Sequence, residues 1–464
     1  MIARKGLGTE IAWAGGSVAT GIATNIMALY GLYYLSKVLG FSPLLAGSLL
    51  LVGKLYDAAV DPLIGGVTDS SRRGSRPFLL PGIVLVSAAI AAFFNLHLAV
   101  PNGGVAGAAL ALIVLLALSS GYAIFSIPYL AMPPAFTEGY DQRTRLMSMR
   151  VAFAMVGVLL SSVAAPILVG KLGGGGDSYG TAGIVLAAIM LVSGSLVWIR
   201  TKGIGASPGE RAAPTLRYVM GSYLRMFSVM QLQPFRVLTL AKLVQLTVLA
   251  IILATTPYFF TFVLGMQQQA IGSYLGVFSI ASLASIVIWR FAVKRFGKRQ
   301  VFVTGLVLYG LGLASWYFYV PGEPTIFRFV RAVLLGSTSA GTLVCTLSML
   351  PDTMEYDRLV TGQAREGLMS GAFAFVEKFA GALGPFVVGA ALQSAGLPKA
   401  ESLIAPSPHA LETIRWAMSV IPSALTLLCA ALVLRYPLDA RMLEEARITK
   451  RAPDIEPGPV CVEA

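Results

Sequence analysis

Charged residues are scarce in this chain of 464 residues. They make up 12% of the sequence, whereas hydrophobic residues make up 56% and the mean hydropathy is +0.76. A water-soluble protein of this size cannot hide so much apolar surface, so the composition predicts a membrane protein that crosses the bilayer many times. The net charge of +13 comes from Lys and Arg in short segments between apolar stretches, without a stripe of aromatic and basic residues, which argues against nucleic-acid binding.

Cysteine and histidine are rarer still, with three and two residues. Cys345 and Cys429 lie in apolar stretches and Cys461 lies near the C-terminus; none has metal-ligand spacing or suggests a disulfide framework. His97 and His409 are far apart in the sequence. Because a membrane-embedded enzyme needs a nucleophile with a base, or metal ligands, the sequence predicts no enzyme, no metal site and no cofactor.

Long apolar stretches are what the sequence has instead. Twelve of them have about the 20 residues that a helix needs to cross the hydrocarbon core. They are predicted to be helices because lipid cannot satisfy the open backbone groups of other structures. The predicted spans are 11–36, 42–68, 78–99, 105–128, 147–170, 181–200, 236–264, 270–292, 301–320, 326–350, 367–394 and 411–435.

The distribution of Lys and Arg predicts the orientation of the spans. These residues concentrate before the first span and after each even-numbered span, whereas the other loops offer mainly Lys37, Lys171 and Lys399. Since cytoplasmic loops carry the excess of basic residues, we expect a multi-pass protein of the cytoplasmic (inner) membrane with both termini in the cytoplasm. The start, MIARKGLG, is too short for a cleaved signal peptide, so the first span is expected to be an uncleaved anchor.

A polar stretch in the middle divides the chain into two halves of six spans. Each half places a basic, glycine-containing turn before a new apolar span, in DSSRRGSRPFLLPGIVL and in VKRFGKRQVFVTGLVL, which suggests internal duplication around a central site. The predicted parts are an N-terminal six-helix bundle (1–200), a cytoplasmic central loop (201–233), a C-terminal six-helix bundle (234–436) and a cytoplasmic, partly disordered tail (437–464).

Two acids stand inside the second span. Asp57 and Asp61 are four residues apart and share a helix face with Lys54. Ionised groups in the hydrocarbon core are costly and usually mark an ion or substrate path. The alternative is a structural cluster in which Lys54 neutralises one acid and Asp61 sits near the helix end beside Pro62. We favour the functional interpretation, because two acids with one base leave a negative charge for which a cation is the simplest partner.

Three basic residues stand out in the second half. Lys378 lies too deep in its span to reach the interface and needs an acidic partner; its neighbour Glu377 points about 100° away, which makes that pairing awkward. Arg328 and Arg331 lie near the outer end of the tenth span. They either extend outward to the interface or attract an anionic solute such as a uronide or a sulfonated sugar.

The sequence around these residues resembles a known family. YDAAVDPLIGGVTDSSRRGSRP, LPDTMEYDRLVTGQAREGLMSGAFAFVEKFAGALG and, more weakly, SIPYLAMPPAFT are similar to signatures of the glycoside–pentoside–hexuronide:cation symporters, the melibiose-permease-like branch of the major facilitator superfamily. The resemblance implies an all-α membrane protein with twelve transmembrane helices in two six-helix bundles and transport by alternating access. It further implies that Asp57 and Asp61 bind the coupling cation and that Arg150 and Lys378 face the substrate.

Departures from the family bear on the substrate. The family's sugar-binding aspartate of the first helix corresponds to Gly21, and a tryptophan of the fourth helix corresponds to Leu130. Binding of a neutral galactoside in the family's manner is therefore in question. Aromatic faces suit the apolar faces of sugars, although an aromatic residue in a span more often serves ordinary packing. The other candidates for the substrate wall are Asn25, Tyr30, Tyr34, Tyr129, Trp316 and Phe375.

Further departures bear on the coupling ion. Sodium needs several oxygen ligands, and the resemblance places three of them at Val60, Ala123 and Ser126, where this chain offers one neutral hydroxyl. A proton needs one carboxylate whose pKa is raised toward the working pH, and two acids a turn apart share it readily. We therefore expect proton coupling, with sodium as the second choice.

The loop TDSSRRGSRP is expected to act in gating as well as in topology. Its salt bridges with neighbouring helix ends are predicted to exist in the outward-facing state and to break on inward opening. The residues involved are Asp69, Arg72, Arg73, Arg76, Asp141 and Arg145.

These observations favour a cation-coupled importer of a sugar, glycoside or sugar acid. Its expected partners are a small-molecule solute, the coupling cation and membrane lipid, and we expect a monomer. A carrier of lysophospholipids or other amphiphiles is the alternative, because Gly21 and Leu130 make the predicted cavity more apolar. A sensor that does not transport is a further alternative, against which Asp57 and Asp61 argue.

Overall fold

The computed structural model describes residues 7–69, 71, 74–100, 104–133, 140–202, 228–363, 365–397, 406–438 and 440–451. Within these residues the regular structure is helical. Eleven helical stretches are long and apolar enough to cross a membrane. One more apolar helix, α13 (Lys298–Ala314), has 17 residues, which is at the short end of the range for a membrane span. Together they correspond to the twelve predicted spans.

The first half of the chain supplies six spans, several of which are built from consecutive helices. Its elements are α1 (Leu7–Gly15), α2 (Ser17–Tyr33), η1 (Tyr34–Val38), α3 (Pro43–Asp69), α4 (Arg76–Phe94), α5 (Leu96–Ala99), α6 (Gly104–Ala131), α7 (Tyr140–Leu159), η3 (Leu160–Ala164), α8 (Ala165–Lys171) and α9 (Gly176–Arg200). We call this group the first bundle.

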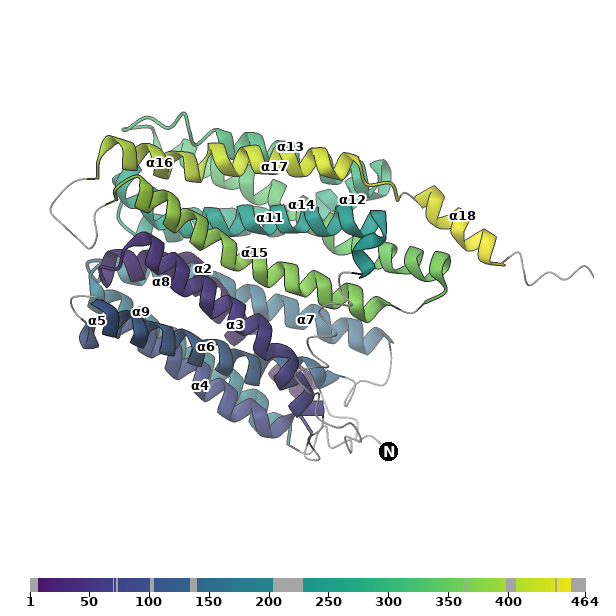
Figure 1. Cartoon of the computed structure of the whole chain (residues 1–464), viewed down its shortest axis with the longest axis horizontal. Helices are drawn as coiled ribbons and strands as arrows, with labels where there is room; N and C mark the ends of the chain where they lie inside the picture. Colours follow the sequence, from purple (N-terminus) through teal and green to yellow (C-terminus); the bar gives the residue numbers. More distant parts are fainter. Residues whose placement is uncertain are drawn as a thin grey trace, which may run out of the picture.

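The second half supplies the other six spans and one helix after them. Its elements are η4 (Val229–Gln231), α11 (Gln233–Tyr258), η5 (Phe259–Val263), α12 (Gln269–Phe296), α13, α14 (Thr325–Thr361), α15 (Glu366–Ser394), α16 (Pro408–Met418), α17 (Val420–Leu434) and α18 (Ala440–Arg451). The spans among them form the second bundle. Figure 1 shows the first bundle in purple and blue beside the second in teal to yellow.

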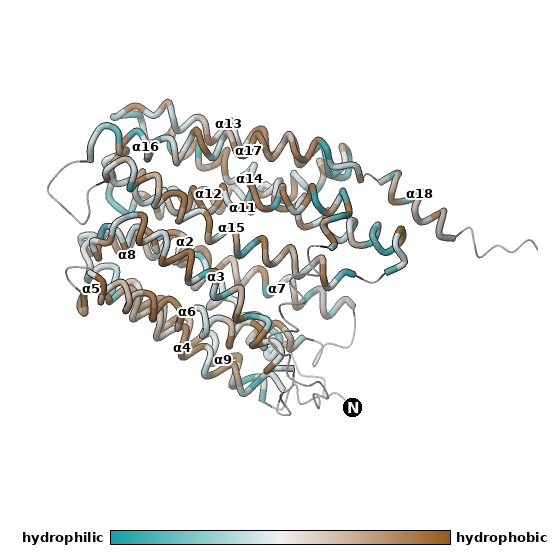
Figure 2. Tube along the Cα trace, viewed as in Figure 1, coloured by the Kyte–Doolittle hydropathy of each residue, from teal (hydrophilic) through white to brown (hydrophobic). Residues whose placement is uncertain are grey.

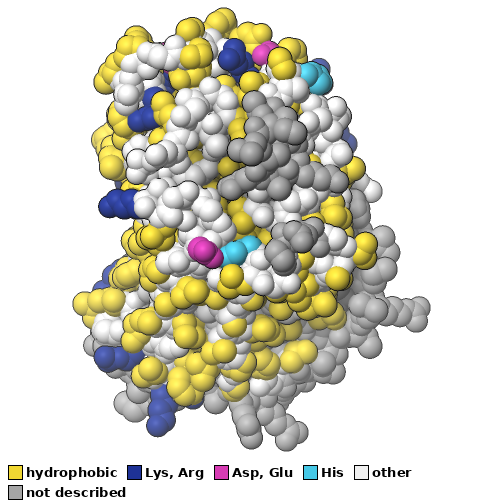
Figure 3. All heavy atoms as spheres, turned by 90° about the vertical axis from the view of Figure 1, so that its left-hand side faces the viewer, with side chains coloured by type: hydrophobic (Ala, Val, Ile, Leu, Met, Phe, Trp, Pro, Cys, Tyr) yellow, Lys and Arg dark blue, Asp and Glu magenta, His cyan; other side chains and the backbone are white. Residues whose placement is uncertain are grey.

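The two ends of the molecule differ. Figure 1 places α5 and α16 at one end and α18 at the other, and we call these the α5 end and the α18 end. Figure 2 shows hydrophobic residues along most of each helix and more hydrophilic ones toward the α18 end. Figure 3 shows the α5 end, where the few acidic and histidine side chains lie among hydrophobic and uncharged surface. The distribution of Lys and Arg predicts that the α18 end faces the cytoplasm.

The two bundles pack closely in the half nearer the α5 end. A Cβ at Gly389 on α15 would overlap the carbonyl oxygen of Pro43, at the start of α3. Such small residues let two helix backbones approach each other inside a membrane. Hydrogen bonds add to this contact: the hydroxyls of Ser36 and Tyr258 lie 2.5 Å apart, and Tyr30 donates to Gln268 at 3.2 Å. The α5 end is therefore closed across the bundles.

Toward the α18 end the bundles spread apart, as the diverging axes of α4 and α17 show (Figure 1). Two arginines at this end bind within the first bundle. Arg145 is paired with Glu10 at 2.5 Å, and Nε of Arg76 donates to the Trp198 carbonyl at 3.1 Å. The second bundle has ion pairs of its own at this end, among them Arg365 with Asp357.

Candidate cation- and solute-binding site

The two intramembrane acids lie on α3, one helical turn apart. Packing of α3 on α6 positions them, because Ser119 donates to the Gly53 carbonyl at 3.1 Å and Tyr56 is hydrogen-bonded to Ser120 at 2.9 Å. The Asp57 side chain is 3% exposed and the Asp61 side chain is 30% exposed. The deeper acid is thus enclosed, and the other is reached by solvent.

Lys378 joins both acids from the other bundle. Its Nζ lies 3.1 Å from Oδ2 of Asp57, forms an ion pair with Oδ2 of Asp61 and donates to the Asp57 carbonyl at 3.4 Å. On α3 itself, Nζ of Lys54 lies 3.9 Å from Asp57 and is 37% exposed. Two acids therefore face two lysines. The sequence pattern predicted a single base, Lys54, and this prediction is wrong. A second base, Lys378, lies more than 300 positions away in the sequence and approaches from α15.

Each acid has one carboxylate oxygen that accepts no hydrogen bond. Oδ1 of Asp57 and Oδ1 of Asp61 are buried and have no hydrogen-bond partner. Buried polar atoms are normally hydrogen-bonded, so such atoms mark a place where a proton or a ligand binds or where the structure changes. The paired lysines neutralise the charge of the acids without using all of their acceptors.

Arg150 on α7 lies in the same region. Its Nε is buried and has no hydrogen-bond partner. Tyr122 on α6 lies within electrostatic range of Asp57, Asp61 and Arg150. The predicted arginine and the two acids therefore both lie near Tyr122. Sequence reasoning did not select Tyr122, because an aromatic residue in an apolar helix gives no signal of its own.

Glu377 is paired with a different lysine. Nζ of Lys242 on α11 lies 3.1 Å from Oε2 of Glu377 and 3.7 Å from the centre of the Phe373 ring. The alternative in which Glu377 neutralises Lys378 is thereby excluded in this conformation. Sequence reasoning missed Lys242, although a lysine within the predicted span 236–264 is an intramembrane charge of the kind that marks a functional site.

The proposed wall residues Asn25 and Phe375 are partly accessible. Asn25 is half-buried and donates to the hydroxyls of Ser161 and Ser162 at 2.9 and 2.7 Å. Phe375 is 36% exposed and its ring stacks on that of Phe379, with centroids 6.4 Å apart.

Gly21 occupies a tight helix crossing. A Cβ at Gly21 would overlap the backbone carbonyl of Ala154 on α7, so a side chain has no room there. The absence of an aspartate at this position therefore accompanies close contact between α2 and α7, and it adds no open volume to the site.

Tyr129 is enclosed in the first bundle. Its ring stacks on Trp13, with centroids 4.7 Å apart. Its hydroxyl lies 2.7 Å from the Ser17 hydroxyl and donates to the Trp13 carbonyl at 2.8 Å. Because no part of Tyr129 is exposed, a solute has no surface of this residue to touch in the present conformation.

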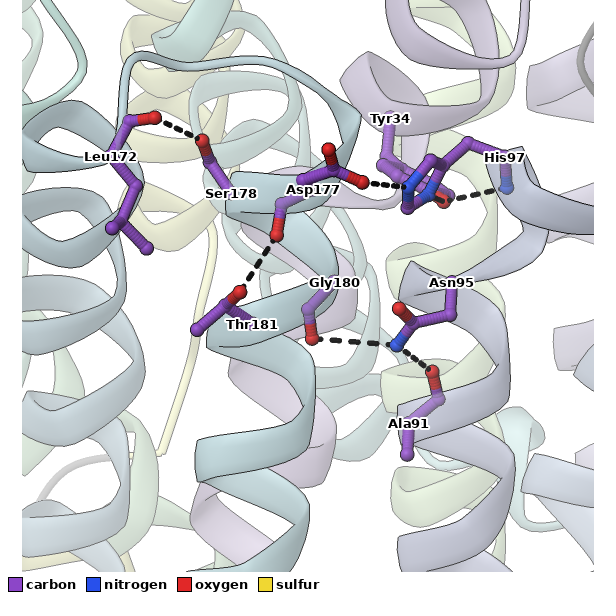
Figure 4. Close-up of polar contacts among 9 residues, drawn as sticks. All are labelled: Tyr34, Ala91, Asn95, His97, Leu172, Asp177, Ser178, Gly180 and Thr181. Atoms are coloured by element: carbon purple, nitrogen blue, oxygen red, sulfur yellow. Dashed lines mark hydrogen bonds and ion pairs between the residues drawn. The ribbon is translucent and has the colours of Figure 1, made fainter.

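Tyr34 lies at the α5 end, where η1 meets α5 and α9 (Figure 4). Its hydroxyl lies 3.2 Å from Nδ1 of His97 and accepts a hydrogen bond from the His97 backbone N–H at 3.3 Å. Nε2 of His97 lies 3.0 Å from Asp177, and Asn95 donates to the Gly180 carbonyl at 3.4 Å. These contacts hold helix ends together. Tyr34 is fully buried among them, away from the acids of α3.

The arginines of the tenth span also lie toward the α5 end. Arg331 donates two hydrogen bonds to Glu323, at 2.6 and 2.9 Å, and its guanidinium lies 4.8 Å from the centre of the Trp316 ring. Nη1 of Arg328 contacts Sδ of Met266 at 2.8 Å. Glu323 therefore already neutralises Arg331, and Trp316 has no exposed surface.

The structure describes the side chains of some of the residues predicted to act in gating. Arg76 and Arg145 bind within the first bundle, as given above. Arg72 and Arg73 lie outside the described residues, and so do the side chains of Asp69 and Asp141. The predicted bridges between these residues stay predictions.

The three positions that bear on the choice of coupling ion lie on α3, which carries the two acids, and on α6, which packs against it. Ala123 and Ser126 are buried on α6, and Val60 is half-buried on α3 between the two acids. In the part of the chain that the structure describes, no three His, Cys, Asp or Glu residues gather in a way that could hold a metal ion.

Comparisons with known proteins agree with this architecture. Residues 12–440 match a family model described as MFS/sugar transport protein. The chain is 28% identical to a putative sulfoquinovose importer of Escherichia coli, over 91% of this chain and 88% of that protein. It is 27% identical to a putative 2,3-dihydroxypropane-1-sulfonate exporter of Escherichia coli, over 95% and 96%.

A solved structure has the same fold. The crystal structure of a D-xylose–proton symporter superposes with a TM-score of 0.62 at 14% identity, covering 94% of this chain and 98% of that one. The predicted all-α fold of two six-helix bundles is confirmed.

Proposed function

The chain belongs to the MFS/sugar transport protein family, and we propose that it couples uptake of an anionic, sugar-like solute to an inward flow of protons. Membership makes it a secondary active membrane transporter of sugar-like solutes and not an enzyme. The observation that carries the proposal is the contact of Lys378 with both Asp57 and Asp61 across the two bundles.

The lysine occupies the place where a coupling cation would act. Its ammonium lies between the two carboxylates, so a second cation has to displace it or neutralise an acid. A proton neutralises one carboxylate directly and weakens its attraction to Lys378. A sodium ion would need several oxygen ligands around it, and Val60 and Ala123 offer none from their side chains. This supports a proton as the coupling ion, with sodium as the second choice.

Protonation would also change the contact between the bundles. Because Asp61 is on α3 and Lys378 is on α15, loss of this ion pair removes an attraction that holds the two bundles together. Asp61 is the more exposed of the two acids, which makes it the more accessible to a proton from solvent. We infer that protonation of Asp61 and binding of the solute together permit the bundles to rearrange.

The conformation fits one state of an alternating-access cycle. The bundles are closed at the α5 end and spread apart at the α18 end, which is predicted to be cytoplasmic. We therefore assign the structure to the inward-facing state. In this state Arg145 pairs with Glu10 and Arg76 donates to the Trp198 carbonyl.

An anionic solute is supported by Arg150. Its unpartnered Nε offers a donor near the acid cluster, and guanidinium groups suit the planar or tetrahedral oxygens of carboxylates and sulfonates. Both relatives named above are assigned sulfonated compounds. We therefore propose a sulfonated sugar or a sugar acid as the solute, ahead of a neutral glycoside.

A binding panel tests the substrate class. The purified protein is titrated with sulfoquinovose, glucuronate, a neutral methyl galactoside and a lysophosphatidylcholine, and thermal unfolding is followed. A bound solute raises the melting temperature through mass action. The proposal expects a shift with sulfoquinovose or glucuronate that Arg150→Gln abolishes. A shift with the galactoside alone would contradict the anionic class, and a shift with the lysolipid alone would favour an amphiphile carrier.

A further inference from the structure

Glu377 places an exposed carboxylate in the middle of a membrane helix. Its side chain is 63% exposed, although α15 is one of the helices that cross the membrane. An ionised group at such a depth faces the bundle interior or a water-filled space, because lipid does not solvate it. Tyr122 on α6 lies within electrostatic range of Glu377 as well as of Asp57 and Asp61. Glu377 also directly precedes Lys378, which binds both acids of α3, so it lies next to the acid cluster.

A buried lysine holds this carboxylate in place. Lys242 is 10% exposed, lies 3.1 Å from Oε2 of Glu377 and packs its ammonium on the Phe373 ring. The ion pair restricts the rotation of the carboxylate. Because Lys242 takes Oε2 while most of the side chain is exposed, the carboxylate keeps acceptor capacity for a ligand.

Open space adjoins the carboxylate. Ala374, Glu377, Lys378 and Gly381 follow one another at helical spacing on one face of α15. A Cβ built on Gly381 would meet no atom within 4 Å, so the helix is not packed at that point. Ala374 and Gly381, on either side of Glu377 and Lys378, are small and leave room for a molecule that touches Glu377.

We propose that Glu377, fixed by Lys242, binds hydroxyl groups of the transported solute. A carboxylate is an acceptor for hydroxyl donors and recognises vicinal hydroxyls with two oxygens. The proposal rests on the function proposed above and deepens it, since Arg150 would bind the anionic group and Glu377 the hydroxyl groups. Arg150 is on α7 of the first bundle and Glu377 is on α15 of the second, so a solute that has both groups bridges the two bundles.

The test compares two sulfonates that differ in their hydroxyl groups. Sulfoquinovose has a sulfonate and a hydroxylated ring, whereas cyclohexylmethanesulfonate has a sulfonate on a ring without hydroxyls. Both are titrated calorimetrically into the wild-type protein and Glu377→Gln. Because hydrogen bonds to a charged group are strong, the variant is expected to weaken sulfoquinovose binding about tenfold or more and to change cyclohexylmethanesulfonate binding by less than about twofold.

Control variants separate binding from folding. Glu412→Gln makes the same chemical change on α16, where Glu412 binds Trp416, and should leave both affinities unchanged. Glu377→Asp keeps the charge and should weaken sulfoquinovose less than Glu377→Gln. A merely structural role for Glu377 would weaken both sulfonates alike.

Two results would overturn the inference in distinguishable ways. Unchanged sulfoquinovose binding by folded Glu377→Gln, or an equal loss for both sulfonates, overturns the role of Glu377 alone. Failure of the wild-type protein to bind either sulfonate overturns the sulfonate class on which the inference rests, and the inference with it.

Discussion

Lys378 on α15 lies 3.1 Å from the carboxylate of Asp57 on α3, so an ion pair between the two bundles sits within the membrane spans. The same ammonium binds Asp61, one helical turn further along α3. Removing one partner of a buried pair leaves an uncompensated charge, which makes such a contact sensitive to protonation. The arrangement of the bundles and the protonation of the acids are therefore linked at this point.

Loss of the ion pairs between Lys378 and the two acids should lower the stability of the protein. Lys378→Met leaves two neighbouring carboxylates with Lys54 alone, at 3.9 Å from one of them. Breaking buried pairs costs about 3–5 kcal/mol, and the partial exposure of Asp61 and Lys378 places the expected cost at or below about 3 kcal/mol. Adding Asp61→Asn should recover part of it, because the surplus charge is removed. Thermal unfolding in detergent measures both effects.

Lys54→Met is the control for this series and should destabilise the protein less, since Lys54 is 37% exposed and more distant. A double variant no more stable than Lys378→Met would show that Lys378 does not act through Asp61.

The arginines should differ in their effect on binding. Arg150→Gln removes an unpartnered donor and is expected to weaken sulfoquinovose binding about 10- to 100-fold, as for a hydrogen bond to a charged group. The double variant Arg331→Gln and Glu323→Gln replaces both partners of an internal pair and should change the affinity by less than about twofold. Calorimetric titration with sulfoquinovose measures the affinity of both variants. A large loss of affinity in the double variant would place the anion site at the α5 end.

Closure at the α5 end should depend on Gly389. A valine there overlaps the backbone of Pro43, so Gly389→Val is expected to hold the bundles apart at that end. Spin labels at Leu98 and Phe318, which are 70% and 74% exposed on the two bundles, report the separation by pulsed electron resonance. The distance should lengthen in Gly389→Val and stay unchanged in Gly367→Ala, where an added Cβ meets nothing within 4 Å. An unchanged distance in Gly389→Val would contradict the closed assignment.

Topology is testable by reporter fusions. Fusions after Arg4, within 201–233 and after Arg451 are all expected to report a cytoplasmic location, because basic residues concentrate on that side. A fusion to Leu172, between α8 and α9 at the other side of the membrane, serves as the control and should report the periplasm. A periplasmic signal from the central loop would contradict the arrangement of six spans and six.

Much of the fold was readable from the sequence, since twelve apolar stretches with alternating basic loops leave few alternatives to a helical membrane protein. The acids of α3 were also readable, because charge inside a span is costly wherever it occurs. Their pairing with Lys378 was not, because no local pattern states which face of α15 meets α3. The enclosure of Tyr34 and Tyr129 is likewise a result of packing between distant helices, and periodicity in one helix does not contain it.

Proton-driven accumulation in sodium-free membrane vesicles tests the central claim most directly. An acid-outside pH gradient is imposed, and uptake of labelled sulfoquinovose is followed in the wild-type protein, Asp57→Asn and Asp61→Asn. The account predicts that the wild type concentrates the solute until a protonophore collapses the gradient, and that both variants exchange solute without concentrating it. Accumulation that requires sodium and ignores the pH gradient, or undiminished accumulation in both variants, would contradict it.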